Sequence, residues 1–454
     1  MAMIIKELLT GFNEHLTIFV VFPLIIIVGL YLSFRLKFVQ LTKLRLGAEC
    51  LFKKDQDCEG DISHFQAISA VLAGNFGTGN ISGMAVAIST GGPGALVWMW
   101  IMAFLGSTIQ YTSCVLGVKY RHRLSSGEHV GGPMYYLADG LGYRFLASAF
   151  CLFVIFGALI VGNLAQINSV ILPLEKLGWD PLLCSFALVA FVGLVLVGGL
   201  QRVAKLASFI VPLKALLYMG AALVILALHV DRIIPACQIM FYSAFDFHSA
   251  LGGVMGFGVL KALRSGFDRG IFATDAGTGI VPILQSGART SSPILDGAVT
   301  LVAPFLVMIV CTTTGLVLLV TGAWLEPGLQ STNMVTHAFE QGLGSSIGSY
   351  IVIVALVLFA YTTILAWACC AEKAIDYLWG EKFSSKFKYL YIAIIPIGTL
   401  LHVDLIWILA DIAISLMLIA NLIGVIGLSK EVIQESNDYF AAPRPAISNA
   451  EVLT

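Results

Sequence analysis

The chain has 454 residues, of which 58% are hydrophobic and only 12% are charged, and its formal net charge is -1. Soluble globular domains carry about 25% charged residues, so this composition excludes an ordinary soluble domain and predicts an integral membrane protein. The 26 basic and 27 acidic residues nearly balance, and no excess of either sign indicates nucleic acid or another polyanion as a partner.

The first fourteen residues lack the continuous apolar core and the small-residue cleavage site of a signal peptide, so we expect the first hydrophobic helix to be retained. Nine cysteines show no metal-ligand spacing, and several lie inside apolar runs. We interpret them as small helix-packing residues. No organic cofactor is expected.

Apolar segments of about 20 residues, the length that crosses a bilayer, predict eleven transmembrane helices. Their approximate limits are 16–36, 66–90, 95–119, 146–171, 181–199, 205–230, 258–288, 297–321, 348–371, 387–402 and 404–428.

Basic residues follow the odd-numbered helices, whereas the loop over 323–347 contains no Lys or Arg. Short cytoplasmic loops are enriched in these residues, so the N-terminus is predicted outside and the C-terminus in the cytoplasm. The basic residues concerned are Lys37, Lys43, Arg45, Lys53, Lys54, Arg121, Arg123, Arg202, Lys382, Lys386 and Lys430.

Two predicted helices contain clustered glycine and polar residues. The second reads GNFGTGNISG over 74–83 and GGPGA over 91–95, and the seventh reads FATDAGTGIVP over 272–282. Glycine alone could serve close helix packing. The polar residues at the same depth, which packing does not need, favour helices that unwind within the membrane and form a binding site. These residues are Asn75, Thr78, Asn80, Thr274 and Asp275.

The two interruptions lie five helices apart, which predicts two five-helix repeats over 66–230 and 258–428. Because five is odd, the repeats must be inverted relative to each other. The remaining parts are a first helix with a basic cytoplasmic loop over 1–65, an external connector over 231–257 and a cytoplasmic tail over 429–454. Unwound backbone offers amide donors to a carboxylate and carbonyl oxygens to a cation, which suits a zwitterionic substrate.

Several motifs resemble the alanine/glycine:cation symporter family. They are GTGNISGMAVAISTGGPGALVWMW over 77–100, EGDISHF over 59–65, GGPMYYL over 131–137, GNLAQINS over 162–169, TTILAWACCAEKAIDYLWG over 362–380 and ADIAISLMLIANLIG over 410–424. The resemblance implies an all-α membrane protein with a LeuT-like 5+5 inverted repeat, which takes up glycine or alanine with sodium.

The same resemblance implies a set of site residues. The substrate would be approached by Thr78, Gly79 and Asn80 on the second helix, by Phe272, Thr274 and Asp275 on the seventh, and by Trp367, which would wall a pocket for a methyl group. Gln166 is either an additional contact or a helix-to-helix hydrogen bond. Departures from the family pattern leave substrate choice and coupling open: ATDAGTGIVP stands where the family usually reads SNEAGLGSAP, so Asp275 replaces a glutamate, and GSTIQYTSC over 106–114 lacks the usual lysine and glutamate.

Lys214 lies about ten residues into the sixth helix, where the family usually has an apolar residue. A charged side chain at that depth indicates a functional site. The LeuT-like arrangement implies a Na+ site there, formed by the carbonyl groups of Ala73 and Phe76 and the hydroxyl groups of Thr362 and Thr363. We hypothesise that the Lys214 ammonium replaces this ion and loads and releases a proton during transport. The alternative is that Lys214 snorkels to the cytoplasmic surface.

Other charges near or within the predicted helices have plainer interpretations. Arg269 is expected to pair with the preceding Asp268, and Asp411 to cap or pair with a neighbouring helix. Lys119 and Glu372 lie at helix ends and are expected at the membrane interface.

The sequence therefore predicts a secondary transporter of a small neutral amino acid, coupled to Na+ by resemblance or to H+ through Lys214, in a bacterial-type inner membrane. A membrane enzyme is disfavoured because no catalytic motif or soluble catalytic domain is visible, and a channel because no repeated filter sequence is visible. The preferred amino acid, its enantiomer and the oligomeric state stay open, since one methylene discriminates by only about 1–3 kcal/mol.

Overall fold

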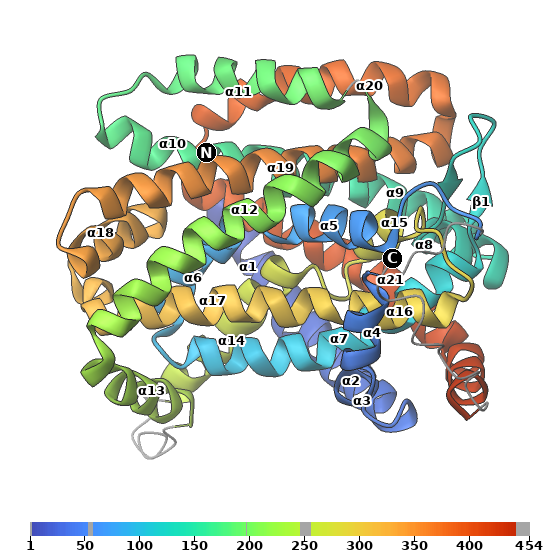
Figure 1. Cartoon of the computed structure of the whole chain (residues 1–454), viewed down its shortest axis with the longest axis horizontal. Coiled ribbons are helices and arrows are strands. Elements are labelled where there is room, and N and C mark those ends of the chain that lie inside the picture. Colours follow the sequence, from blue (N-terminus) through green and yellow to red (C-terminus); the bar gives the residue numbers. More distant parts are fainter. Residues whose placement is uncertain (1, 53–57, 197, 246–255, 442–454) are drawn as a thin grey trace.

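The computed structural model describes residues 2–52, 58–196, 198–245 and 256–441. Helices run mainly along the long axis of the molecule (Figure 1). Within the described ranges the named strands are β1, His122–Arg123, and β2, His129–Val130, which pair antiparallel with His122 opposite Val130. We call the end of the molecule that holds this hairpin the hairpin face, and the end that holds Lys6 and Glu326 the N-terminal face.

The helices follow one another from α1 to α21. The first half of the chain contains α1 (Ala2–Leu16), η1 (Thr17–Val21), α2 (Phe22–Arg35), α3 (Val39–Thr42), α4 (Leu44–Cys50), α5 (His64–Asn75), η2 (Thr78–Asn80), α6 (Ser82–Gly91), α7 (Ala95–Lys119), α8 (Pro133–Tyr135), η3 (Tyr136–Gly140), α9 (Arg144–Leu159), η4 (Ile160–Leu164), α10 (Ala165–Lys176), α11 (Pro181–Leu196) and α12 (Gly199–Leu228). The second half contains α13 (Val230–Phe245), α14 (Gly256–Thr274), α15 (Ile280–Gln285), α16 (Pro293–Thr300), α17 (Val302–Thr321), η6 (Ala323–Leu325), α18 (Ser331–Leu343), α19 (Ile347–Trp379), α20 (Glu381–Ile394), η7 (Ile395–Thr399) and α21 (Val403–Ala441).

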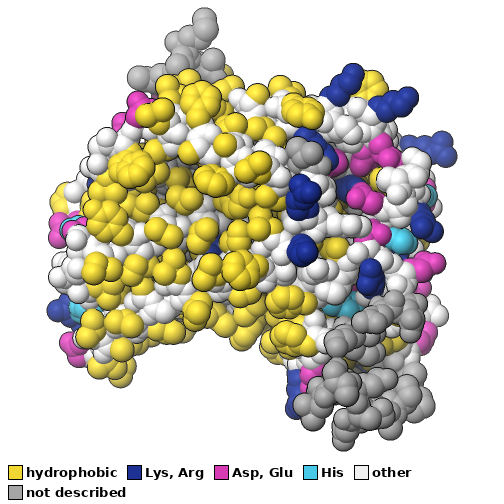
Figure 2. Space-filling model, turned by 45° about the horizontal axis from the view of Figure 1, so that its top comes forward, with side chains coloured by type: hydrophobic (Ala, Val, Ile, Leu, Met, Phe, Trp, Pro, Cys, Tyr) yellow, Lys and Arg dark blue, Asp and Glu magenta, His cyan; other side chains and the backbone are white. Residues whose placement is uncertain are grey.

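Seven helical segments of the described chain are long and apolar enough to cross a membrane. They are Lys6–Arg35, Ala95–Lys119, Arg144–Lys176, Gly199–Leu228, Pro293–Thr321, Ile347–Trp379 and Val403–Ala441. Hydrophobic side chains cover the middle of the visible surface, and charged side chains gather toward its ends (Figure 2). This distribution is that of a multi-pass membrane protein.

Four other predicted spans are shorter or divided. Residues 66–90 and 258–288 are broken into α5 and α6 and into α14 and α15, α11 has 16 residues, and α20 has 14. The count of eleven transmembrane helices and the inverted repeat therefore stay predictions.

The two predicted helix interruptions are confirmed. The first helical stretch ends at Asn75 and resumes, after a short 3-10 turn, at Ser82. The second ends at Thr274 and resumes at Ile280. Gly277 and Gly279 adopt φ angles of 90° and 87°, a left-handed conformation that favours glycine, so the GTG triplet explains the second interruption locally.

Both interrupted segments lie at the centre of the bundle. α5 packs against α12, α19 and α15, whereas α14 packs against α7 and α6. The position of α5, α6 and α15 between the longer helices is visible in Figure 1. The surrounding helices thereby shield the unwound backbone from lipid, as a broken membrane helix requires.

Some predicted boundaries differ from the observed ones. The first helix begins at Ala2 instead of near residue 16, and α21 continues to Ala441, so the segment predicted as a tail starts as a helix. Most of the predicted connector over 231–257 is helical, as α13. The basic residues Lys53 and Lys54, positions 246–255 of the connector and positions 442–454 of the tail lie outside the described residues.

Candidate functional site

A small closed cavity lies between the two helix interruptions. Its volume is about 10 Å³, close to the smallest space that accommodates one water molecule. The residues that line it are Gly74, Asn75, Gly77, Gly79, Val161, Gln166, Phe272, Asp275, Thr363 and Trp367. The two interruptions therefore meet at a shared cavity, as the sequence predicts.

Side-chain amides satisfy carbonyl groups at the interrupted helix ends. Asn75 Nδ2 donates to the carbonyl oxygen of Thr274 at 2.7 Å and so joins the two interruptions directly. Asn80 Nδ2 donates to the carbonyl oxygen of Asn75 at 2.6 Å, and Asn421 Nδ2 to that of Gly277 at 2.8 Å. Buried backbone groups need such partners, which explains why amide side chains accompany the glycines.

The polar groups around the cavity are divided into donors and acceptors. The backbone N–H and the hydroxyl group of Thr78 are donors, and both are directed at Gln166 Oε1, at 2.9 and 3.0 Å. Asn75 Oδ1 and Asp275 Oδ1 are buried acceptors that have no hydrogen-bond partner in the described part of the chain. An unpaired buried acceptor costs about 1–3 kcal/mol, so a cationic ligand group would be favoured beside Asp275.

Five of the eight predicted substrate residues line the cavity: Gly79, Gln166, Phe272, Asp275 and Trp367. Thr78 lies next to it and contacts Gln166.

The predicted substrate residues Asn80 and Thr274 do not line the cavity, and their side chains are bonded to nearby carbonyl groups instead. Asn80 bonds the carbonyl groups of Asn75 and Gly77, and Thr274 Oγ1 donates to the carbonyl oxygen of Gly270 at 2.7 Å.

Four lining residues are not among the predicted site residues: Gly74, Asn75, Gly77 and Val161. Gly74 and Gly77 belong to the glycine motif that predicted the interruption. Asn75 carried a signal, since it is a polar residue inside the interrupted motif. Val161 carried none, because it lines the cavity only through the π-helical turn Ile160–Leu164.

Lys214 occupies the position expected from the sequence hypothesis. Its Nζ donates to the carbonyl oxygen of Phe76 at 2.8 Å and to Thr362 Oγ1 at 2.5 Å, and it lies 4.6 Å from the ring centroid of Phe359. Lys214 is fully buried, so the snorkelling alternative is wrong.

The residues proposed as cation ligands divide into two pairs. Phe76 and Thr362 contact the ammonium group, whereas Thr363 Oγ1 donates to the carbonyl oxygen of Ala73 at 2.8 Å. A second cation at the same oxygens would be repelled by the ammonium at short range. This set therefore does not fit Na+ while Lys214 holds its observed position.

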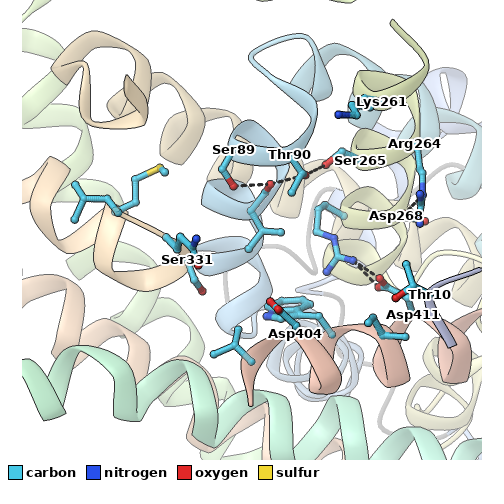
Figure 3. Close-up of a pocket in the computed structure, with 18 of the residues that line it drawn as sticks. Thr10, Ser89, Thr90, Lys261, Arg264, Ser265, Asp268, Ser331, Asp404 and Asp411 are labelled. Carbon is cyan, nitrogen blue, oxygen red and sulfur yellow. Dashed lines mark hydrogen bonds and ion pairs between the residues drawn. The ribbon is translucent and has the colours of Figure 1, made fainter. Parts of the chain in front are cut away.

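A wider pocket of about 850 Å³ opens near the N-terminal face (Figure 3). Arg269 and Asp411 line it and form an ion pair of 2.5 Å, and the Arg269 guanidinium lies 4.6 Å from the ring centroid of Trp407. The ring of Phe272, which lines the small cavity, lies 4.7 Å from the same Trp407 ring, centroid to centroid. This layer of rings and charges separates the wide pocket from the small cavity.

The ion pair corrects one prediction and confirms another. Arg269 pairs with Asp411 on α21 instead of with the preceding Asp268, whose own ion-pair partner is Arg264 at 3.7 Å. The pairing of Asp411 with a neighbouring helix is confirmed.

The charges expected at the interface are found near the hairpin face. Lys119 is about one-third exposed and pairs with Glu431 and Glu435, and Glu372 pairs with Lys388 at 2.8 Å.

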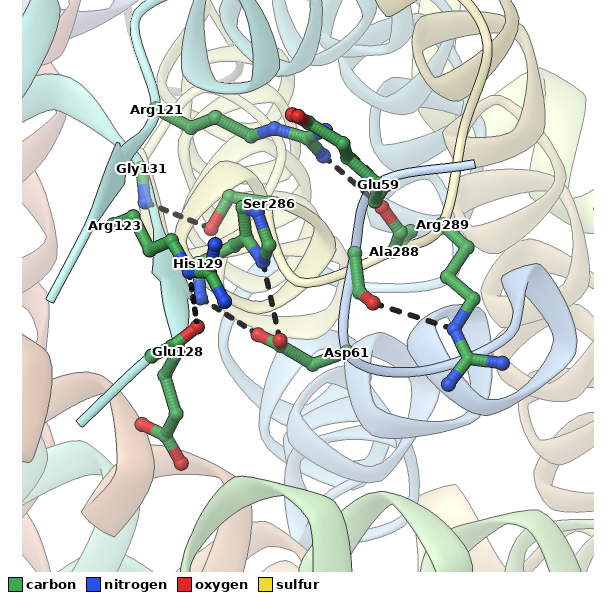
Figure 4. A network of polar contacts seen from close by, with 12 residues as sticks. Glu59, Asp61, Arg121, Arg123, Glu128, His129, Gly131, Ser286, Ala288 and Arg289 are labelled. Atoms are coloured by element: carbon green, nitrogen blue, oxygen red, sulfur yellow. Dashed lines mark hydrogen bonds and ion pairs between the residues drawn. The ribbon is translucent and has the colours of Figure 1, made fainter. Parts of the chain in front are cut away.

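At the hairpin face a polar network connects the hairpin with the segments next to α5 and α15 (Figure 4). The segment before α5 pairs with the segment after α15, since the backbone N–H of Asp61 donates to Gly287 O at 2.8 Å and that of Arg289 donates to Ile62 O at 2.8 Å. Asp61 also accepts from the backbone N–H of His129 at 2.7 Å. The molecule is thus closed at this face and hollowed at the other.

A central cavity between two interrupted helices, with a wide pocket at one face, is the arrangement typical of a membrane transporter. A family model described as the sodium:alanine symporter family matches residues 1–451. The chain belongs to the sodium:alanine symporter family, and it is a transporter and not an enzyme.

Relatives support the same assignment over nearly the whole length. An uncharacterized transporter of Haemophilus influenzae is 44% identical over 424 residues, covering 92% of this chain and 93% of that protein. The sodium/alanine symporter AgcS of Methanococcus maripaludis is 38% identical over 433 residues, covering 93% and 94%. The crystal structure of MhsT in complex with L-phenylalanine has a TM-score of 0.61 at 14% identity, covering 84% of this chain and 93% of MhsT, which shows a LeuT-like fold.

Proposed function

We propose that this protein imports a small neutral amino acid, of the alanine or glycine type, by cation symport. The single observation that carries the proposal is the cavity between the two helix interruptions, with the donors of Thr78 beside it on one interruption and the unpaired acceptor of Asp275 lining it on the other. A zwitterion would place its carboxylate near the unwound end at Thr78 and its ammonium near Asp275. Membership of the sodium:alanine symporter family supports the same substrate class.

The packing of the cavity wall indicates that the substrate has a small side chain. Trp367 is buried and lines the cavity, and it packs so closely on α9 and η4 that a Cβ added at Gly162 would lie 2.3 Å from its Cβ. The indole therefore has little freedom to withdraw. A methyl group or a hydrogen is the side chain that such a site would admit most readily.

The proposed architecture is eleven transmembrane helices with inverted repeats over 66–230 and 258–428, joined by the connector over 231–257. The positions of the two interruptions, α5 to α6 and α14 to α15, support this pairing. The concentration of basic residues at the hairpin face supports a cytoplasmic location for that face. The N-terminus would then lie outside, and the wide pocket would open to the exterior of a bacterial-type inner membrane.

The family supports Na+ as the coupling ion, whereas one observation favours a proton. The Lys214 ammonium already bonds Phe76 and Thr362, two of the four residues proposed for a Na+ site. We propose that Lys214 is the resident cation at this position and that coupling there uses proton loading and release. Sodium coupling would require Lys214 to leave its observed contacts.

The test is uptake by proteoliposomes of labelled L-alanine in competition with a panel of amino acids, with Na+ and pH varied separately. The proposal expects inhibition by alanine, glycine and serine, weak inhibition by large side chains, and uptake driven by a pH gradient without Na+. Absence of saturable uptake for any small neutral amino acid would overturn the substrate class. Strict dependence on a Na+ gradient would overturn proton coupling alone.

A further inference from the structure

Gln166 holds a fixed orientation at the cavity wall. It follows the π-helical turn Ile160–Leu164, and its Nε2 donates to the carbonyl oxygen of Val161 in that turn at 2.9 Å. Its Oε1 accepts from the backbone N–H and the hydroxyl group of Thr78. Because both ends of the amide are bonded and the residue is 1% exposed, the carbonyl end is directed specifically at Thr78.

The two groups that donate hydrogen bonds to Gln166 Oε1 are donors that a substrate carboxylate would also bind. Thr78 begins η2 within the interruption between α5 and α6, and its N–H and its hydroxyl group both donate to Gln166 Oε1. A carboxylate forms shorter and stronger hydrogen bonds with such donors than a neutral amide oxygen does. The amide oxygen of Gln166 therefore stands where one carboxylate oxygen of a zwitterion would bind best.

The local space does not allow both groups at once. Gln166 packs directly on Gly77, where a Cβ would lie 3.0 Å from Gln166 Oε1 and 3.0 Å from Thr363 Oγ1. The cavity of about 10 Å³ holds about one water, whereas alanine fills several times that space. A lining group must move before a substrate enters, and Gln166 is the one whose bonds the substrate can replace with stronger ones.

We propose that the Gln166 amide is an internal competitor that occupies the carboxylate subsite of the closed cavity and is displaced by the carboxylate of the substrate. The inference rests on the proposed function and deepens it. Gln166 is then a specificity-determining residue: ligands with a free carboxylate displace it, whereas the corresponding amino alcohols and amino amides, which offer only neutral acceptors, do not. A permanent substrate ligand or a passive helix contact at Gln166 would behave differently.

The experiment measures equilibrium binding of L-alanine and L-alaninol to the purified full-length protein. Gln166→Met removes the competing acceptor at similar volume, so L-alanine should bind about 5-fold or more tightly, the effect of one ordinary hydrogen bond. Gln166→Glu supplies a tethered carboxylate, so L-alanine should bind at least about 10-fold more weakly. Wild type should not bind L-alaninol measurably.

Asn168→Met is the matched control, since it removes an amide from the same helix. Asn168 Nδ2 bonds the carbonyl oxygens of Gly398 and Leu401, away from the cavity, and its variant should bind L-alanine within 2-fold of wild type.

Weaker or unchanged binding by Gln166→Met would overturn the inference while leaving the transport function intact. If that variant does not fold, binding by Gln166→Glu as tight as wild type would overturn it equally. Failure of wild type to bind L-alanine, glycine or L-serine would overturn the proposed function itself.

Discussion

Replacement of Lys214 by alanine should change the coupling ion of the transporter from H+ to Na+. The substitution removes an ammonium group but leaves the oxygens of Phe76 and Thr362, and those of Ala73 and Thr363 beside them. Carbonyl and hydroxyl oxygens around a space of ammonium size are ligands for a hard monovalent cation. We therefore expect Na+ to bind Lys214→Ala and not wild type at this position.

The magnitude follows from the contacts of the ammonium. Two hydrogen bonds to a charged donor contribute about 1.5–3 kcal/mol each, and burial of the charge costs several kcal/mol. The free energy of unfolding should therefore change by only about 1–3 kcal/mol in Lys214→Ala. Na+ at 100 times its dissociation constant should restore about 2.7 kcal/mol.

The assay compares thermal unfolding and alanine uptake in Na+ and in K+ at equal ionic strength. Lys214→Ala should gain unfolding temperature in Na+ and should require Na+ for uptake, whereas wild type should show neither effect. Lys214→Met fills the space without a charge and should be inactive in both salts. Equal stabilisation of wild type and Lys214→Ala by Na+ would refute the assignment of Lys214 as the resident cation.

Three further substitutions test the cavity and its cover. In Gly79→Ala the new Cβ would lie 2.5 Å from Phe272 Cδ1; the ring must shift at a cost of about 1–3 kcal/mol, and alanine uptake should fall about 10-fold or more. Trp367→Phe enlarges the cavity, so the inhibition constant of valine should fall about 10-fold relative to that of alanine. Asp411→Asn leaves Arg269 buried without its charged partner, which costs about 3–5 kcal/mol, and the dissociation rate of bound alanine should rise at least about 10-fold.

Each of these substitutions has a control in the chain. A Cβ at Gly220 meets no heavy atom within 4 Å, so Gly220→Ala should transport normally. Lys6→Met breaks the exposed ion pair with Asp404 on the same helix as Asp411, which contributes about 0–1 kcal/mol, and alanine dissociation should change less than 2-fold. Normal uptake by Gly79→Ala, unchanged selectivity in Trp367→Phe, or unchanged dissociation in Asp411→Asn would contradict the account of that residue.

Local chemistry determines the features that were predictable from the sequence. Gly277 and Gly279 take left-handed backbone angles, and Asn75 and Asn80 bond carbonyl groups of the interrupted helices. Their residue types alone therefore mark where the backbone must unwind. Lys214 was predictable for a similar reason, because a buried charge needs oxygens nearby and the unwound second helix supplies one through Phe76.

Features that depend on contacts between distant segments were not predictable. Arg269 forms its ion pair with Asp411, 142 residues away, and not with its sequence neighbour Asp268, because the fold brings α21 against α14. Asn80 and Thr274 do not line the cavity, because their side chains bond nearby carbonyl groups, and residue type alone does not indicate which partner such a side chain takes. Gln166 was seen as a site residue, but the direction of its amide depends on the π-helical turn at Val161.

An experimental structure determined with L-alanine bound tests the central claim most directly. The account predicts alanine between the two helix interruptions, with its carboxylate within hydrogen-bond distance of the Thr78 N–H, its ammonium beside Asp275 and its methyl group against Trp367. Alanine bound only in the wide pocket at the N-terminal face, with the Thr78 and Asp275 segments unchanged, would contradict it.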